Sequence, residues 1–200
     1  MAYKFLKRLI DILGASLGLL VVAPFSPIIA LAIKMETKGP AFVKLDRVSA
    51  GKIVKVYKFR SMVDSAEKMK NRLLHLNERG DGPFFKVKND PRLTKVGKLI
   101  RRFRIDEFPQ LLNVLKGELS LVGPRPHEPS EVIHYPHPYK HLILEKAGVT
   151  GLSQVNGASS LPFLKELEFD NRYTLKKNPW LDAKIICKTV AILFFDPTAV

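Results

Sequence analysis

The stretch from Arg101 to Glu107 combines three arginines with two neighbouring carboxylates, in the order Arg-Arg-Phe-Arg-Ile-Asp-Glu. An ionised and oriented aspartate is a competent nucleophile toward phosphorus. A neighbouring glutamate suits Mg²⁺, which is usually held by one or two carboxylates together with phosphate oxygens of a substrate. Guanidinium groups can grip a diphosphate in bidentate fashion. These residues therefore indicate phosphoryl-transfer chemistry, with Asp106 as the nucleophile and Glu107 as the metal ligand.

The same two carboxylates also have a purely structural interpretation. Asp106 is predicted to cap a helix that carries Glu107, Phe108 and Pro109 in its first turn, where proline is tolerated. The positive end of the helix dipole and the nearby guanidiniums both favour the ionised form of the two carboxyl groups. Since carboxylates are common at helix starts, spacing alone leaves both interpretations open.

Two further motifs present a cation in a defined place. Gly123-Pro124-Arg125-Pro126 cannot be helical, because the residue before each proline is pushed toward an extended conformation. A stiff loop lowers the ordering cost when Arg125 binds a phosphate or a base. Lys58 and Arg60 lie close together at the end of a predicted strand. For both motifs, a surface cation without a functional role is the alternative.

Charge and composition limit the classes of partner. The 200 residues include 33 Lys and Arg against 19 Asp and Glu, a net charge of +14. Residues 84–104 alone hold eight Lys or Arg and one Asp. Such an excess predicts an anionic partner, either nucleic acid, acidic lipid or a phosphorylated substrate. The single cysteine, Cys187, excludes a disulfide scaffold and a cysteine-rich zinc module, and it fits a reducing compartment.

Two of the remaining possibilities are disfavoured by spacing. The basic run has neither helix-turn-helix nor zinc-finger spacing and lacks interleaved aromatics, so we expect no nucleic-acid partner. His134, His137 and His141 are separated by prolines and have no acidic or cysteine cluster nearby, so we expect no metal there. Anionic lipid or a lipid phosphate is the simpler partner.

The N-terminal segment predicts a membrane anchor. From Ile12 to Ile33 no side chain is charged, and a helix of that length would span ~33 Å, about the thickness of a bilayer hydrocarbon core. The stretch is too long for the apolar region of a signal peptide and has no evident cleavage site. Pro24 and Pro27 interrupt it, and Ser26 is placed to bond a backbone carbonyl freed by the break.

Lysines and arginines flank this segment on both sides, and positive flanks favour the cytoplasmic face. We therefore predict a re-entrant helix hairpin over 1–38, broken at Ser26-Pro27, which leaves both ends in the cytoplasm. Residues 39–200 would form a cytoplasmic catalytic domain with interfacial helices. A kinked single span and a helix pair buried in a soluble core are the alternatives.

The remaining chain predicts an α+β, mostly helical domain that contains one β-hairpin. The hairpin has strands over 41–48 and 52–60, joined by a three-residue loop that ends in Gly51. Helices are expected over 62–79 with Asp64 as a cap, 95–103, 106–117, 163–173 and 179–195. Residues 148–157 have the composition of a loop. The last helix fits either a membrane interface or the core.

Taken in order, these motifs resemble those of the bacterial sugar transferases, the monotopic phosphoglycosyl transferases that start glycan assembly on polyprenyl phosphate. The matching stretches are Lys-Phe-Arg-Ser-Met at 58–62, Asn-Asp-Pro-Arg-Leu-Thr-Lys-Val-Gly at 89–97, the run at 101–126, and Gly-Val-Thr-Gly-Leu-Ser-Gln-Val-Asn-Gly at 148–157. The resemblance covers essentially the whole chain, and a motif set of this length and order is highly specific.

The resemblance implies a reaction and a set of roles. In the family an aspartate, here Asp106, attacks the β-phosphorus of a nucleoside diphosphate sugar, usually a UDP-sugar, and releases UMP. Polyprenyl (undecaprenyl) phosphate then takes the sugar phosphate from the enzyme ester. Glu107 would bind Mg²⁺ as the cofactor. The implied substrate-binding residues are Lys58, Arg101, Pro124, Arg125, Pro126 and Gln154. The enzyme would be monotopic in the bacterial inner membrane, with its catalytic domain on the cytoplasmic face, and would act in the first membrane step of glycan or exopolysaccharide biosynthesis.

One departure from the family pattern is Ala158, since an arginine commonly follows Gln154-Val-Asn-Gly157. Either another cation, with Arg172 as a candidate, replaces that contact, or the sugar specificity differs. No multi-span segment precedes the predicted hairpin, so we expect a minimal catalytic form, and a homodimer remains open. The competing classes are a non-catalytic basic adaptor at the membrane and a phosphotransferase of multi-span architecture, which the single apolar segment disfavours.

Overall fold

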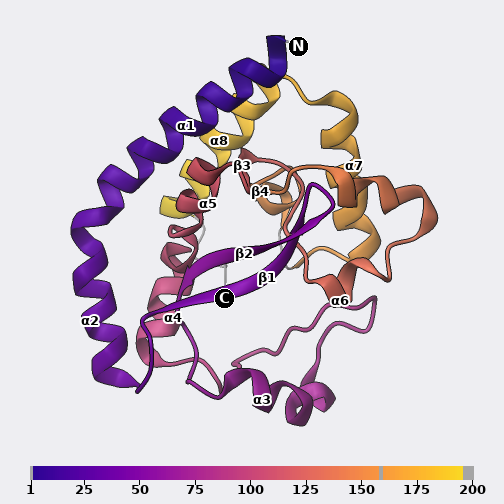
Figure 1. The fold of residues 1–200 in the computed structure, drawn as a ribbon. Coiled ribbons are helices and arrows are strands. Elements are labelled where there is room, and N and C mark those ends of the chain that lie inside the picture. The colour runs from indigo at the N-terminus through magenta and orange to yellow at the C-terminus, as the bar shows by residue number, and fades with distance from the viewer. Residues whose placement is uncertain (1, 158–159, 196–200) are drawn as a thin grey trace.

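The computed structural model describes residues 2–157 and 160–195. Helices predominate, and they are joined by two small sheets of two strands each. Figure 1 shows a long bent N-terminal helix along one side, a β-hairpin across the middle, and α7 (Phe163–Lys176) on the opposite side. The mostly helical α+β class predicted from the sequence, with one long apolar N-terminal helix and a β-hairpin, is confirmed. Ala158, where the sequence departs from the family pattern, lies outside the described residues.

The N-terminal segment is an interrupted helix. Helix α1 (Ala2–Val22) leads through a 3₁₀ turn, η1 (Ala23–Phe25), into α2 (Ser26–Glu36). Ser26 Oγ donates to the Val22 carbonyl at 3.1 Å, which confirms the predicted repair of the break. The helix axis changes direction at η1, but α2 does not fold back alongside α1 (Figure 1).

This segment exposes its apolar side chains. Over Tyr3–Glu36 it is the one helix in the described chain that is long and apolar enough to cross a membrane, by length and composition. Only 6% of its most apolar 18-residue window is buried inside the protein. The alternative of a helix pair buried in a soluble core is therefore wrong. The re-entrant topology remains a prediction.

The β-hairpin forms almost where the sequence predicts it. Strands β1 (Phe42–Ser49) and β2 (Lys52–Phe59) are antiparallel, with a register that runs from Phe42 opposite Phe59 to Ser49 opposite Lys52. The loop has two residues rather than three. Ala50 and Gly51 both have positive φ, at 51° and 72°, and such a turn matches the right-handed twist of the strands.

The helix predicted over 62–79 is shorter than expected. It consists of α3 (Ala66–Lys70) and the 3₁₀ segment η2 (Asn71–Leu76). Asp64 does not cap it, because this carboxylate lies toward Arg60, with 3.8 Å between Oδ1 and Nη1. The prediction therefore overestimated the helix at both ends.

Helix α4 (Lys95–Arg102) confirms the predicted basic helix and is fixed at its N-terminus. Thr94 Oγ1 accepts from the Gly97 backbone at 2.8 Å. The Glu36 carboxylate at the end of α2 accepts from the Lys95 and Val96 backbones at 2.6 and 2.8 Å. The backbone N–H groups of the first turn of α4, which have no partner within the helix, therefore find acceptors on Thr94 and Glu36.

The second half of the chain packs around a small parallel sheet. The 3₁₀ turn η3 (Ile105–Glu107) and helix α5 (Gln110–Lys116) lead to strand β3 (Ser120–Val122), which pairs with β4 (Gly148–Thr150). The other elements are α6 (Pro129–Val132), η4 (His137–Leu144), η5 (Gln154–Asn156), α7 (Phe163–Lys176) and α8 (Pro179–Phe195). The predicted loop at 148–157 therefore holds a short strand and a 3₁₀ turn.

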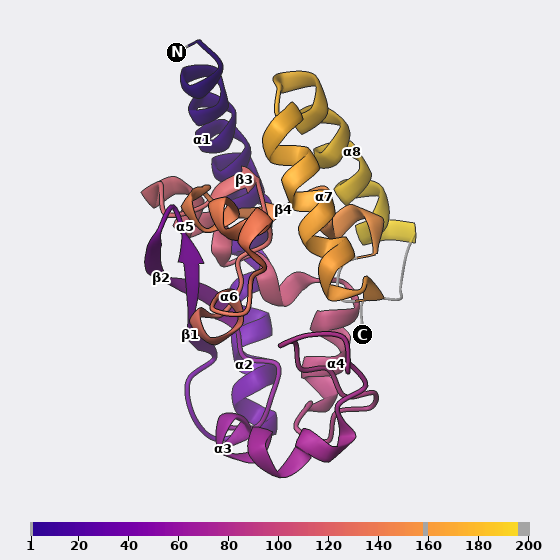
Figure 2. The ribbon, with the colours of Figure 1, turned by 90° about the vertical axis from the view of Figure 1, so that its right-hand side faces the viewer.

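The last two helices meet near the turn that joins them, where the Tyr173 hydroxyl donates to Asp182 Oδ1 at 2.7 Å; both helices are seen in Figure 2. Asn178 Oδ1 accepts from the Leu181 backbone at 3.0 Å, which confirms the predicted start of α8. Ile185 is buried in a cluster with Val122 and Tyr173, so one face of α8 belongs to the core. Trp180 is 70% exposed, and an interfacial role for the other face remains a prediction.

A buried amide joins the hairpin to the helix that follows the acidic turn. Asn113 of α5 is completely buried. Its Oδ1 accepts from the Tyr57 backbone at 3.0 Å, and its Nδ2 donates to the Lys55 carbonyl at 2.8 Å. The side chain therefore pairs with the open edge of β2 as a neighbouring strand would.

Replacing this amide tests its contribution to the fold. Asn113→Ala leaves a buried N–H and a buried C=O of β2 unpaired, which is expected to cost about 2–4 kcal/mol. The thermal unfolding midpoint of the purified protein in detergent should fall accordingly. Asn71→Ala makes the same change at an exposed position of η2 and should leave the midpoint unchanged. Equal midpoints for the two variants would contradict the assignment.

Candidate active site

The two carboxylates lie in a turn of their own between α4 and α5. Arg104 has a left-handed backbone, with φ of 53°, and this reverses the chain directly before η3. The N-cap of α5 is Pro109, so the prediction that Asp106 caps the helix is wrong. The left-handed residue ends α4 and gives the acidic pair a separate 3₁₀ turn, in which Asp106 is 7% exposed.

Lys58 reaches this turn from the end of β2. Its Nζ lies 2.5 Å from Glu107 Oε1. Both side chains are mostly enclosed, with 21% and 33% of their side-chain surfaces exposed. The hairpin thus brings a cation from a motif almost fifty residues earlier in the chain onto one member of the acidic pair. The association of Lys58, Asp106 and Glu107 predicted from the motifs is present in the structure.

The pKa values of the two neighbouring carboxyl groups are shifted in opposite directions. Burial raises the pKa of Asp106 to about 6; the charges of Lys58 and Arg101 oppose this rise, and the Glu107 charge adds to it. Burial also acts to raise the pKa of Glu107, but the charge and hydrogen bond of Lys58 outweigh it and hold that pKa at about 2. The expectation that both carboxyl groups would be driven toward ionisation is thus correct for Glu107 and wrong for Asp106.

The arginines before the turn differ in their placement. Arg101 acts on Asp106, and Arg104 acts on Glu107, each favouring the charged carboxylate. Arg102 is exposed and lies over the Phe103 ring, 5.8 Å from its centroid. The predicted group of three guanidiniums is therefore a pair at the acidic turn and one cation on the surface.

The loop at 123–126 brings a further cation toward the same turn. Arg125 is partly buried, and its charge also lowers the pKa of Glu107. Pro124 is buried, and its carbonyl accepts from the Gly148 backbone at 2.8 Å. Pro126 is partly buried. The rigid presentation of Arg125 predicted from the two prolines is consistent with this anchoring.

Gln154 has a different environment from the other predicted substrate-binding residues. It is 9% exposed, and its Nε2 donates to the Val149 carbonyl at 2.9 Å. The interactions of this amide are with the backbone around β4. Within the described chain, its buried Oε1 has no hydrogen-bond partner. The structure thus brings Lys58, Arg101, Arg125 and the acidic pair together, while Gln154 supports the neighbouring loop.

The acidic turn fits magnesium better than zinc. Within 2–157 and 160–195, no group of three or more His, Cys, Asp or Glu residues is arranged to hold a metal ion by itself. Mg²⁺ commonly keeps several waters and uses one or two carboxylates together with phosphate oxygens. The single carboxylate of Glu107 fits that pattern, so the metal would arrive with a phosphorylated ligand.

Sequence reasoning missed two carboxylates that lie behind the loop. Glu166 and Asp170 of α7 are each 1% exposed. They lie four residues apart, on the same helix face as the buried Phe163, Leu167 and Tyr173. Their position on an otherwise apolar helix face could have indicated a buried polar site, because charged side chains are rarely buried without partners.

The raised pKa of Asp106 predicts a gain in stability when its charge is removed. Its pKa in the folded state, about 6, lies above the ordinary value of 3.8, so stability is lost as the pH rises from 3.8 to about 6, and the full cost applies above that. Asp106→Asn should therefore raise the thermal unfolding midpoint at pH 8, and the gain should shrink at pH 5. Asp46→Asn, at a half-exposed position, should change neither value. A lower midpoint for Asp106→Asn at pH 8 would contradict the inferred charge state.

Comparison with known proteins identifies the family to which the chain belongs. Residues 2–196 match the family model described as bacterial sugar transferase. The chain is 40% identical over 195 residues to a galactosyl transferase, CpsE, of Streptococcus agalactiae, covering 96% of this chain and 43% of the relative. It is 38% identical over 195 residues to the undecaprenyl-phosphate galactose phosphotransferase of Salmonella typhimurium, covering 95% and 40%.

A third relative is similar in length. The exopolysaccharide production protein ExoY of Rhizobium meliloti is 32% identical over 188 residues, which cover 92% of this chain and 83% of that protein. The chain thus spans less than half of the first two relatives and most of the third. The match to the family model extends over nearly every residue, including all the motifs described above. This chain belongs to the bacterial sugar transferase family.

Proposed function

We propose that this protein is a phosphoglycosyl transferase that moves a sugar 1-phosphate from a UDP-sugar to undecaprenyl phosphate. The observation that carries the proposal is the buried Asp106 beside the Lys58–Glu107 ion pair, with Arg101 and Arg125 acting on the same turn. Relatives named as undecaprenyl-phosphate galactose phosphotransferase and UDP-glucose:undecaprenyl-phosphate glucose-1-phosphate transferase support this substrate class.

The first step forms an ester on the enzyme. A carboxylate oxygen of Asp106 attacks the β-phosphorus of the UDP-sugar, and the bond from that phosphorus to the bridging oxygen breaks. UMP leaves with the bridging oxygen, and the sugar phosphate stays on Asp106. A carboxylate with a pKa near 6 is ionised at neutral pH, and it is more basic than an exposed aspartate, which favours nucleophilic attack.

The second step regenerates the carboxylate. A phosphate oxygen of undecaprenyl phosphate attacks the phosphorus of the ester, and the bond between phosphorus and the Asp106 oxygen breaks. The product is a lipid diphosphate sugar. This two-step scheme uses one nucleophile and needs no separate general base, since both attacking groups are already anions.

The surrounding cations stabilise the charge that collects on phosphorus. Lys58 and Arg125 are held by ion pairs before the substrate arrives, and preorganised charges of this kind lower the barrier without reorganisation. Arg101 adds its charge at the same turn. Glu107 would hold Mg²⁺, which when bound neutralises phosphate charge. Arg125 is proposed to contact the nucleotide, as its loop lies beside the turn.

The N-terminal helix is proposed to place this site at the membrane. Residues 1–38 would enter and leave the cytoplasmic leaflet of the bacterial inner membrane, with 39–200 as the catalytic domain on the cytoplasmic face. The exposed apolar surface of α1 and α2 and the break at Ser26-Pro27 support this arrangement. The phosphate of a lipid substrate would lie at the level of the catalytic turn.

Loss of the nucleophile gives the direct test of the reaction. Purified protein is incubated with a set of UDP-sugars and a short polyprenyl phosphate, and UMP is measured. Asp106→Asn should reduce UMP release by at least about thousandfold, because the ester cannot form. Asp46→Asn, a matched change on the exposed hairpin, should retain the wild-type rate. A normal rate for Asp106→Asn would overturn the proposal.

The membrane arrangement has its own test. In a Cys187→Ser background, Lys4→Cys places a unique thiol near the N-terminus, at an exposed position. Labelling of intact cells with a membrane-impermeant reagent should not reach this thiol. Adding Pro24→Ala and Pro27→Ala should straighten the helix, move the N-terminus across the bilayer and expose the thiol to the reagent. Labelling of the variant that keeps both prolines would contradict the re-entrant topology.

A further inference from the structure

The loop that carries Arg125 is fixed along its whole length. The Gly123 backbone donates to the Thr150 carbonyl at 2.9 Å, and the His127 carbonyl accepts from the Val48 backbone at 2.9 Å. Between them, the Arg125 backbone donates to Asp170 Oδ2 at 3.0 Å. The loop is thus bound to β4, to the hairpin and to α7. Its backbone has little freedom, so the direction of the Arg125 side chain depends on what holds the guanidinium.

Glu166 holds that guanidinium from behind. Its Oε1 lies 3.6 Å from Arg125 Nε and 2.8 Å from His127 Nε2. Its Oε2 lies 4.0 Å from Arg79 Nη1. A carboxylate that is 1% exposed would be costly without such partners. Although burial alone would raise its pKa, Arg125 and His127 keep the pKa of Glu166 below its ordinary value, so the group is charged.

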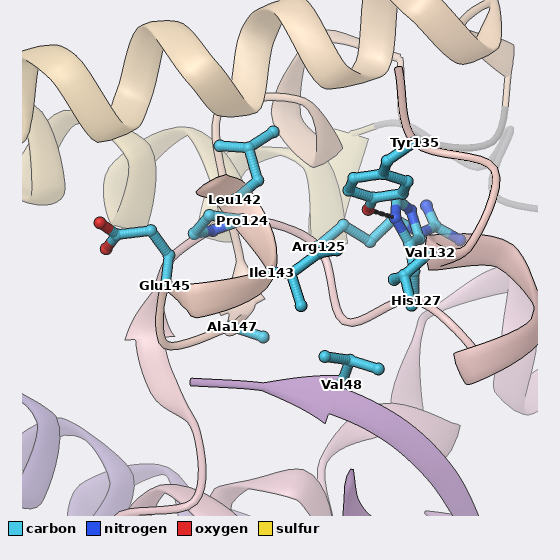
Figure 3. Close-up of a pocket in the computed structure, with 10 residues that line it drawn as sticks. All are labelled: Val48, Pro124, Arg125, His127, Val132, Tyr135, Leu142, Ile143, Glu145 and Ala147. Carbon is cyan, nitrogen blue, oxygen red and sulfur yellow. Dashed lines mark hydrogen bonds between the residues drawn. The ribbon is translucent and has the colours of Figure 1, made fainter. Parts of the chain in front are cut away.

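His127 and Tyr135 orient the Glu166 carboxylate. Figure 3 shows the Tyr135 hydroxyl directed at the His127 ring, where it bonds Nδ1. Burial raises the pKa of Tyr135, so this hydroxyl keeps its proton and can donate to Nδ1. Since a carboxylate only accepts, Nε2 carries the hydrogen donated to Glu166. The cavity lined by Arg125, His127 and Tyr135 is about 10 Å³, room for no more than one water molecule.

The Arg125 guanidinium therefore interacts with two carboxylates of different roles. Glu166 lies 3.6 Å from its Nε, and the guanidinium charge also acts on Glu107 of the acidic turn. We infer that Glu166 is a positioning residue, which holds Arg125 in the orientation that meets the nucleotide phosphate. The inference rests on the proposed function, because it assigns Glu166 to the binding of the nucleotide of that substrate.

Kinetics of UMP release test this role. Glu166→Gln keeps the shape of the side chain but removes the charge that holds the guanidinium. It should raise KM for the UDP-sugar by about tenfold and change kcat by less than about twofold. Glu166→Asp keeps the charge and should recover part of the loss. Glu168→Gln is the matched control, since its exposed carboxylate pairs with Lys165 on the outer face of α7, and it should leave KM unchanged.

A double-mutant cycle separates positioning from general support of the fold. In an Arg125→Ala background, Glu166→Gln should add no further increase in KM, because the group through which it acts is gone. UMP affinity, measured by calorimetry, should show the same non-additivity without any turnover. Equal effects of Glu166→Gln in both backgrounds, or a wild-type KM for that variant, would overturn the inference while leaving the proposed reaction intact. A wild-type protein that binds UMP but releases none from UDP-sugars would overturn the reaction alone.

Discussion

The ion pair between Lys58 and Glu107 decides how the acidic turn behaves. Two adjacent carboxylates in a largely enclosed turn cannot both carry an unbalanced charge cheaply. Lys58 contacts Glu107 directly, so that group is charged, while the buried Asp106 keeps a raised pKa near 6. The proposed mechanism uses this difference, with Glu107 as the group that holds a cation and Asp106 as the nucleophile. This division depends on the end of β2 meeting the turn, and Asn113 maintains it by pairing α5 with the open edge of β2.

The N-terminal helix fixes the two helices on either side of that turn. Arg8 of α1 donates to the Val114 and Leu115 carbonyls at 2.6 and 2.7 Å, and so caps the end of α5. Glu36 at the end of α2 accepts from the first two backbone amides of α4. Each of the two helices of the proposed anchor, α1 and α2, therefore caps one end of a helix next to the turn that holds Asp106. A shift of the break at Ser26 would be transmitted to the catalytic turn through these caps.

Local signals in the sequence predicted those features that depend on neighbouring residues. The hairpin, α4, the end of α5 at Gly117 with its positive φ, and the start of α8 all follow from patterning and turn chemistry. The acidic turn was assigned wrongly because a left-handed arginine is not encoded by any local preference, as Gly or Asn would be. Glu166 was missed because its partners come from loops forty residues away, and only the folded chain brings them together.

The placement of the cations also bears on the departure at Ala158, which lies outside the described residues. Arg172 was the candidate to replace the missing arginine. It is exposed on α7 and lines a cavity together with Leu152 and Asn156 of the motif that precedes Ala158, so it remains a candidate. Arg104 is a second cation, at the acidic turn itself. It acts directly on Glu107, and its buried Nε has no hydrogen-bond partner in the described chain, so one donor is left for an incoming anion. Its left-handed backbone, which costs energy in an arginine, is what brings that donor to the turn.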